Sequence, residues 1–283
     1  MKIGIKTGAY FTDQLTAEGL ARVKAHGYSC LDYQLLTDTN WRGYALQGQA
    51  FDVFFRESAQ QVREAGLEIS QTHGPWRYPP RDATPQERQE RFDKMARALH
   101  ATALLDSPCM VIHPIMPFGV QRNPDPEQFW ALNLDYYRRL TKLARQEGVI
   151  LCLENMPFPN LTLSRPEEIF ALVQEIDDRF LRMCLDTGHC AVCGVPPATA
   201  IRRMGPWLQA LHVHDNDGVR DLHWLPYEGV VDWADFAKAL SETGWQGVLS
   251  LETGVAPGQK PEWLLEGQRR TLAQIADSLA GNF

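Results

Sequence analysis

Eight short, almost uninterrupted apolar runs alternate with longer amphipathic segments, and this alternation constrains the fold more than any other feature of the sequence. Strands that are apolar throughout are buried on both faces, as in parallel sheets covered by helices. Eight strand–helix repeats in 283 residues are the pattern of a (β/α)8 TIM barrel. The expected strands are 2–7, 28–33, 67–72, 108–112, 149–153, 181–185, 208–213 and 247–251.

The segments between these runs have helical periodicity and recognisable ends. Several open with Thr-Pro or Asp-Pro, which supplies a cap and a first-turn proline, and several close at a glycine. No linker or low-complexity stretch divides the chain, so we expect one domain over 1–283. The expected helices are 16–25, 51–65, 84–105, 125–147, 165–176, 232–243 and 263–279, and 197–208 leads into the seventh strand.

Polar residues appear at the same end of nearly every expected strand. A doubly wound open sheet is the alternative fold, but it does not explain this arrangement, whereas all eight C-terminal strand ends of a barrel face one mouth. Of the eight histidines, only His26 and His100 fall outside the set. The set is Asp32, His73, His113, Glu154, Asp186, His189, His212, His214, Asp221, His223 and Glu252.

The groups that follow strands five to eight have the chemistry of a divalent-metal site. Glu154, Asp186, a histidine of strand seven and Glu252 come from successive strands, which a barrel brings together. His212 and His214 are two residues apart and point to the same face of a strand, so either could be the ligand. Two glutamates, an aspartate and a histidine suit Mn²⁺, Mg²⁺ or Co²⁺, and also Zn²⁺. A polar strand end that only caps a loop is the alternative.

The charge balance and the cysteines indicate which partners and which cellular location to expect. A formal net charge of -7 makes nucleic acid a poor partner, because a phosphate backbone attracts a basic face. The six cysteines include one CxxC pair, Cys190 and Cys193, without the second pair of a structural zinc site, so we expect reduced, structural thiols. Residues 1–5 are typical of a strand and not of a signal peptide, and no run reaches a membrane span. We expect a cytoplasmic, soluble protein, either a monomer or a homo-oligomer.

The ordered set of motifs resembles the xylose-isomerase-like TIM barrels, which include sugar isomerases and epimerases, inosose-processing enzymes and endonuclease IV. The resemblance covers nearly the whole chain. Each motif alone is weak, and the ordered set is specific for the superfamily but not for the reaction. The motifs are Leu153-Glu-Asn155, Leu185-Asp-Thr-Gly-His189, His212-Val-His-Asp215, Asp221-Leu-His223, Glu228-Gly-Val-Val-Asp-Trp233 and Leu251-Glu-Thr253.

Resemblance to the ketose 3-epimerases of this family implies one divalent ion held by Glu154, Asp186, His212 and Glu252. The two glutamates would also act as catalytic acid and base on opposite faces of the sugar. One removes the proton beside the carbonyl and the other returns a proton, through an enediolate that the cation stabilises. His189 would hold a substrate hydroxyl or assist proton movement. The expected activity is therefore isomerisation or epimerisation of a sugar or cyclitol.

Resemblance to endonuclease IV implies a different reaction. Its trinuclear zinc site uses five further ligands, and this chain offers a residue for each, so a second or third ion stays open. The acidic charge balance and the lack of a Lys/Arg-rich loop at a strand end weigh against DNA, but a polynuclear zinc hydrolase of phosphodiesters is an alternative. A non-catalytic sugar-binding barrel is another. The five residues are His73, His113, His189, Asp221 and His223.

The remaining candidates would contact the substrate. His73, His113, His214, Asp221 and His223 are expected to do so where they do not bind metal. Aromatic residues near the mouth would stack on a sugar ring or pack under loops. These are Tyr10, Phe11, Trp76, Trp224 and Tyr227.

Two basic residues lie where a barrel often binds phosphate. Arg220 and Lys260 follow strands seven and eight, whose loops form such sites, and we expect Arg220 to contact the substrate. No glycine-rich phosphate cradle accompanies them. We therefore expect a small substrate without phosphate, a sugar or a cyclitol.

Overall fold

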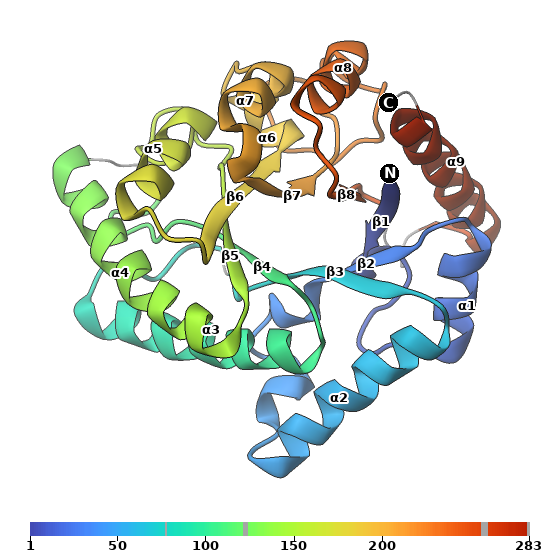
Figure 1. Cartoon of the computed structure of the whole chain (residues 1–283), viewed down its shortest axis with the longest axis horizontal. Helices are drawn as coiled ribbons and strands as arrows, with labels where there is room; N and C mark the ends of the chain where they lie inside the picture. Colours follow the sequence, from blue (N-terminus) through green and yellow to red (C-terminus); the bar gives the residue numbers. More distant parts are fainter. Residues whose placement is uncertain (77, 121–123, 256–259, 282–283) are drawn as a thin grey trace.

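The computed structural model describes residues 1–76, 78–120, 124–255 and 260–281. Within them, eight parallel strands lie in the order β7-β6-β5-β4-β3-β2-β1-β8, with helices around the outside (Figure 1). Each strand is within two residues of its expected position, because continuous apolar runs are buried on both faces of a parallel sheet. The strands are β1 (Lys2–Lys6), β2 (Cys30–Tyr33), β3 (Glu68–His73), β4 (Cys109–Ile112), β5 (Ile150–Glu154), β6 (Leu181–Asp186), β7 (Leu208–His212) and β8 (Val248–Leu251).

The ring closes between β7 and β8. Val213, directly after β7, forms a parallel bridge with Leu251. Its backbone N–H donates to the Ser250 carbonyl at 2.8 Å, and its carbonyl accepts from the Glu252 N–H at 3.0 Å. The predicted TIM barrel is therefore confirmed, and the doubly wound open sheet is wrong, because the two strands that would form its edges pair with each other.

The helices follow the expected periodic segments. Thr84 and Glu87 form a capping box at α3, and Asp125 and Asp232 cap α4 and α8. One short helix, α6, was not expected. The helices are α1 (Ala17–Ala25), α2 (Gln49–Glu64), α3 (Pro85–Leu104), α4 (Pro126–Glu147), α5 (Pro166–Ile176), α6 (Thr187–Val192), α7 (Pro197–Met204), α8 (Trp233–Thr243) and α9 (Glu262–Gly281).

Alternation along the strands separates two sets of buried side chains. One set packs against the helices, and a smaller set of strand residues forms a cluster of its own inside the ring. Glu154, Asp186 and His212 lie two residues beyond members of this inner cluster and so point to the same inward side. All six cysteines are free and buried, as expected. The inner cluster contains Cys109, Val111, Cys152, Cys184 and Ala210.

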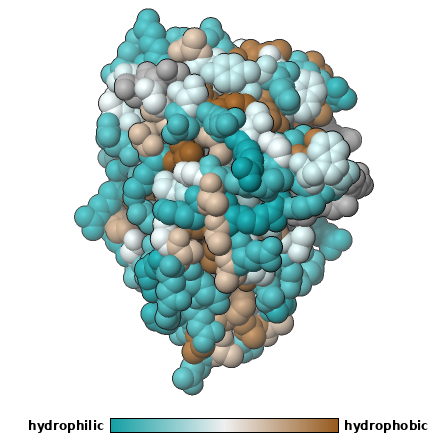
Figure 2. Space-filling model, turned by 90° about the vertical axis from the view of Figure 1, so that its right-hand side faces the viewer, coloured by the Kyte–Doolittle hydropathy of each residue, from teal (hydrophilic) through white to brown (hydrophobic). Residues whose placement is uncertain are grey.

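The outer surface carries little continuous apolar area on the side where α1 and α9 lie. Figure 2 shows this side as mostly hydrophilic, with apolar side chains in small groups. Among the helices of the described ranges, none is long and apolar enough to cross a membrane.

The last helix is joined to the first by a charged cluster on Glu266. Its carboxylate accepts from Arg22 at 2.8 Å, from His26 at 2.9 Å and from Arg270 at 2.9 Å. The hydrogen bonds from Arg22 and His26 lower the pKa of Glu266 to about 2. The folded-state pKa thus lies below the unfolded value of about 4.3. The stabilisation is present above that value and is lost as the pH falls toward 2.

We therefore expect Glu266→Gln to lower the free energy of unfolding at pH 7 by about 1 kcal/mol, the size of an exposed charged network. The difference from wild type should shrink at pH 3, because this pH lies below the unfolded-state pKa of about 4.3 and the carboxylate is then protonated on unfolding. Urea midpoints at the two pH values measure both effects. Glu57→Gln, on the exposed side of α2, is the control, and an equal loss for Glu266→Gln at both pH values would contradict the ion-pair explanation.

Candidate metal centre

Four side chains at the ends of adjacent strands converge at the barrel mouth. Glu154, Asp186 and His212 end β5, β6 and β7, and Glu252 follows β8. Each offers a ligand atom, and these atoms all lie within 4.8 Å of one another. His212 Nδ1 is 2.6 Å from Glu154 Oε1 and 3.3 Å from Glu252 Oε2. Two ligands of one ion lie up to about 4.2 Å apart, so small side-chain movements would let all four share a divalent cation.

The histidine of this group is held from behind by a carboxylate. His212 Nε2 is 3.1 Å from Asp32 Oδ2, so the proton on Nε2 is donated there and Nδ1 faces the other ligands. A carboxylate behind a histidine fixes the ring and its tautomer in metal sites. The side-chain amides of Gln34 and Gln71 donate to the same Asp32 oxygen at 3.0 and 3.3 Å. Gln34 also donates to Glu252 Oε1 at 2.6 Å.

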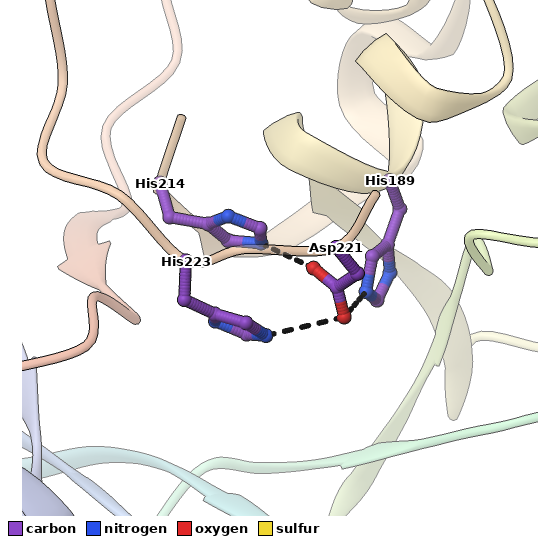
Figure 3. A group of neighbouring side chains, drawn as sticks. All are labelled: His189, His214, Asp221 and His223. Atoms are coloured by element: carbon purple, nitrogen blue, oxygen red, sulfur yellow. Dashed lines mark hydrogen bonds and ion pairs between the residues drawn. The ribbon is translucent and has the colours of Figure 1, made fainter. Parts of the chain in front are cut away.

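A second group lies beside the first and contains His189, His214, Asp221 and His223 (Figure 3). Asp221 Oδ2 is 3.3 Å from His189 Nε2 and 3.2 Å from His223 Nε2. His214 stacks on His223, and its Nε2 is 2.9 Å from Asp186 Oδ2, so it connects the two groups. Of the two histidines of strand seven, His212 therefore lies in the first group and His214 in the second.

The orientation of two histidines in the second group is typical of metal ligands. His189 Nδ1 is 2.7 Å from the Asn155 carbonyl, and His223 Nδ1 is 2.6 Å from the Glu252 carbonyl. A carbonyl oxygen only accepts, so Nδ1 of each ring carries a proton, and Nε2, which faces the Asp221 carboxylate, is the nitrogen that would bind a metal after losing its own proton. Metal-ligating histidines commonly donate their other N–H in this way.

Two further histidines approach the other oxygen of Glu154. His113 Nε2 is 2.9 Å and His73 Nε2 is 3.5 Å from Glu154 Oε2, and the two ring nitrogens are 3.1 Å apart. His73 Nδ1 lies 2.8 Å from the Gly74 carbonyl and donates to it, so Nε2 is the nitrogen that faces Glu154 and the other ligands. His73, Glu154 and His212 thus form a third set of donors that could hold an ion.

Histidines close to Glu154 keep its carboxylate ionised. Burial would raise the pKa of Glu154, but His212 and hydrogen bonds from His113, His212 and His73 hold it well below its usual range. Burial would lower the pKa of His189, but Asp186 and Asp221 raise it to about 10. Burial lowers the pKa of His113 to about 4. The protons on the histidines occupy the role that a divalent cation would take, so metal binding would release protons.

Asp215 organises the long loop between β7 and α8. Its carboxylate accepts from the backbone N–H groups of Asn216, Gly229 and Val231 at 2.9, 3.0 and 3.2 Å, and from Trp233 Nε1 at 2.9 Å. A Cβ on Gly229 would lie 2.3 Å from Asp215 Oδ1, so only glycine fits against the carboxylate. This loop carries Asp221 and His223 to the mouth.

We expect Asp215→Asn to lower the free energy of unfolding by about 1–3 kcal/mol, because an amide nitrogen would face N–H donors. Urea denaturation measures the loss. Asp217→Asn is the matched control, since Asp217 lies in the same loop and accepts from Val219 and Arg220 near the surface. Equal losses in the two variants would contradict the organising role of Asp215.

The groups open into a pocket of about 500 Å³. Trp76 lines it and meets the His113 ring edge-on at 5.3 Å. Arg220 is not among its lining residues, and its guanidinium pairs with Asp217 at 2.8 Å. Tyr10 and Phe11 pack in the core. The pocket is lined by Thr37, His73, Trp76, Tyr78, His113, Glu154, Met156, Pro157, Phe158, His189, Asp221, His223 and Glu252.

The sequence pointed to the acidic and imidazole groups of the site but missed the amides that hold them. Gln34 directly follows β2, so its place at a strand end was the available signal. Gln71 lies inside β3, two residues before His73, so its signal was alternation, which puts it on the same inward face as that histidine. α6 was missed as well. Asp186 caps it by accepting from the His189 N–H at 2.6 Å, and the helix thereby brings His189 toward the second group.

Comparison with known proteins agrees with this architecture. A family model described as a xylose isomerase-like TIM barrel matches residues 20–274. The D-psicose 3-epimerase of Ruminiclostridium cellulolyticum is 26% identical over 148 residues, which are 52% of this chain and 49% of that enzyme. The chain thus matches about half the length of that relative.

Two solved structures show the same fold over nearly the whole chain. D-psicose 3-epimerase with D-tagatose from Clostridium cellulolyticum H10 superposes with a TM-score of 0.78 at 18% identity and covers 99% of both chains. The IolI protein with a bound zinc atom has a TM-score of 0.79 at 17% identity and covers 100% of this chain and 99% of its own. These likenesses show the fold, and the family model, which matches residues 20–274, shows that the chain belongs to the family of xylose isomerase-like TIM barrels.

Proposed function

We propose that this protein is a divalent-metal-dependent sugar epimerase or isomerase. The main support for the proposal is that only two of the four residues face the pocket. Glu154 and Glu252 line the pocket, whereas Asp186 and His212 lie behind them and do not. Two carboxylates that can reach both a cation and a substrate are what proton transfer beside a carbonyl requires. The sugar epimerases among the relatives support the same class of reaction.

Each residue of the site then has a part in the reaction. A divalent ion, Mn²⁺, Zn²⁺, Co²⁺ or Mg²⁺, held by Glu154, Asp186, His212 and Glu252 would act as a Lewis acid on the substrate carbonyl. One glutamate removes the proton on the adjacent carbon and the other returns a proton. Gln34 holds Oε1 of Glu252, which leaves Oε2 for this work. His189 lines the pocket and donates to or accepts from a substrate hydroxyl.

A polynuclear zinc hydrolase is the second candidate function. The second group, with Nε2 of His189 and His223 aimed at Asp221, favours it, because a one-ion epimerase does not need a further set of ligands. The nearby His73 and His113 add donors on Glu154. Metal content separates the two candidates.

We expect elemental analysis of the purified native protein to find about one divalent ion per chain, and chelation to abolish isomerase activity. Three zinc ions per chain, together with phosphodiesterase activity, would instead support the hydrolase.

We expect the wild-type protein to incorporate solvent deuterium into a ketose, because the proton beside the carbonyl is removed and replaced. Glu154→Gln and Glu252→Gln should each lower the exchange rate at least about a hundredfold, the size of a general acid–base contribution, with the fold unchanged by circular dichroism. NMR of a ketose panel in deuterated water measures the exchange. Wild-type exchange in either variant would remove that glutamate from the role proposed for it, and no exchange in the wild type would favour a sugar-binding barrel.

A further inference from the structure

The pocket has two unlike sides. Its floor consists of the imidazole and carboxylate groups described above. One wall is apolar and comes from two loops: Trp76 and Tyr78 follow β3, and Met156, Pro157 and Phe158 follow β5. Proton transfer at the floor does not use this wall.

The aromatic residues of the wall form a row from the floor to the rim. Trp76 meets the ring of His113, a floor residue, at 5.3 Å with the planes at 75°. Tyr78 continues the row, 6.0 Å from Trp76 and near-parallel to it at 25°. Trp76 is half-buried, and Tyr78 is 59% exposed. Trp76 therefore lies deeper in the pocket wall, and Tyr78 lies next to it, nearer to solvent.

A single free sugar would leave this row without a partner. Under the proposed function, the carbonyl end and the hydroxyls of a hexose would contact Glu154, Glu252 and His189 on the floor. The pocket volume of about 500 Å³ lies within the roughly 300–1,000 Å³ of sites that take drug-sized ligands. Tyrosine and tryptophan rings offer a flat apolar face to another ring.

We infer that the substrate is a ketosugar that carries a second ring at the end remote from its carbonyl, and that this ring lies on Trp76 and Tyr78. The inference rests on the proposed function, because it assumes that the carbonyl end lies at the floor. The second ring is either another sugar or an aryl group, since both have an apolar face that can stack on an aromatic side chain. The second ring takes no part in the proton transfer.

The test compares three ketoses that share an unmodified carbonyl end: D-fructose, 6-O-glucosyl-D-fructose and 6-O-benzyl-D-fructose. Calorimetry on the metal-loaded protein gives the three dissociation constants. At least one of the two ring-bearing sugars should bind about three- to tenfold more tightly than D-fructose, the size of a stacking contribution. Tighter binding of 6-O-glucosyl-D-fructose identifies the second ring as a sugar, and tighter binding of 6-O-benzyl-D-fructose identifies it as an aryl group. Equal or weaker binding of both would overturn the inference.

Variants of Tyr78 make the test specific. Tyr78→Ala should remove most of the preference for the ring-bearing sugar, and Tyr78→Phe should keep it, because the ring and not the hydroxyl makes the contact. Tyr227→Ala is the matched control, since Tyr227 is also 59% exposed and is not among the residues that line this pocket. A preference that survives Tyr78→Ala, or that Tyr227→Ala reduces equally, would overturn the inference.

Deuterium exchange separates this inference from the proposed function. If deuterium exchanges into both free and ring-bearing ketoses but the two bind equally well, the epimerase proposal stands and the second-ring site is overturned. A binding preference without exchange into any sugar would leave the site and overturn the proposed chemistry.

Discussion

The burial of negative charge at one end of the barrel is the constraint on which the rest of the structure depends. Asp32, Glu154 and Asp186 are buried, and the side chain of Glu252 is only 12% exposed. Isolated carboxylates are very costly to remove from water, and pairing with positive charge and hydrogen-bond donors offsets that cost. The histidines and the amides of Gln34 and Gln71 supply this compensation. A divalent cation would supply it in a more compact form.

The barrel makes such a concentration of charge feasible. On β5 and β6 a carboxylate reaches the mouth while the residue two positions earlier, Cys152 before Glu154 and Cys184 before Asp186, stays in the apolar interior. The loops then add what strands cannot reach. α6 turns His189 inward, and the loop held by Asp215 brings Asp221 and His223 over the opening.

Most of the fold could be predicted from the sequence, because eight apolar runs and their caps are local signals. α6 could not, since Thr187 and Gly188 are poor helix formers and the helix depends on Asp186, which caps it only where β6 ends. The polar residues of the mouth were found by their place at strand ends. Their division into separate groups was not, because it depends on loop geometry. Arg220 was expected at the substrate, but Asp217, three residues earlier, is a nearer partner for its guanidinium.

Anomalous diffraction from a crystal of the protein grown with Mn²⁺ would locate the cation. We expect a manganese peak about 2.0–2.3 Å from side-chain atoms of Glu154, Asp186, His212 and Glu252. A mouth without a peak at saturating Mn²⁺, or a peak ligated only by His189, Asp221 and His223, would contradict this expectation, because the two glutamates would then share no cation.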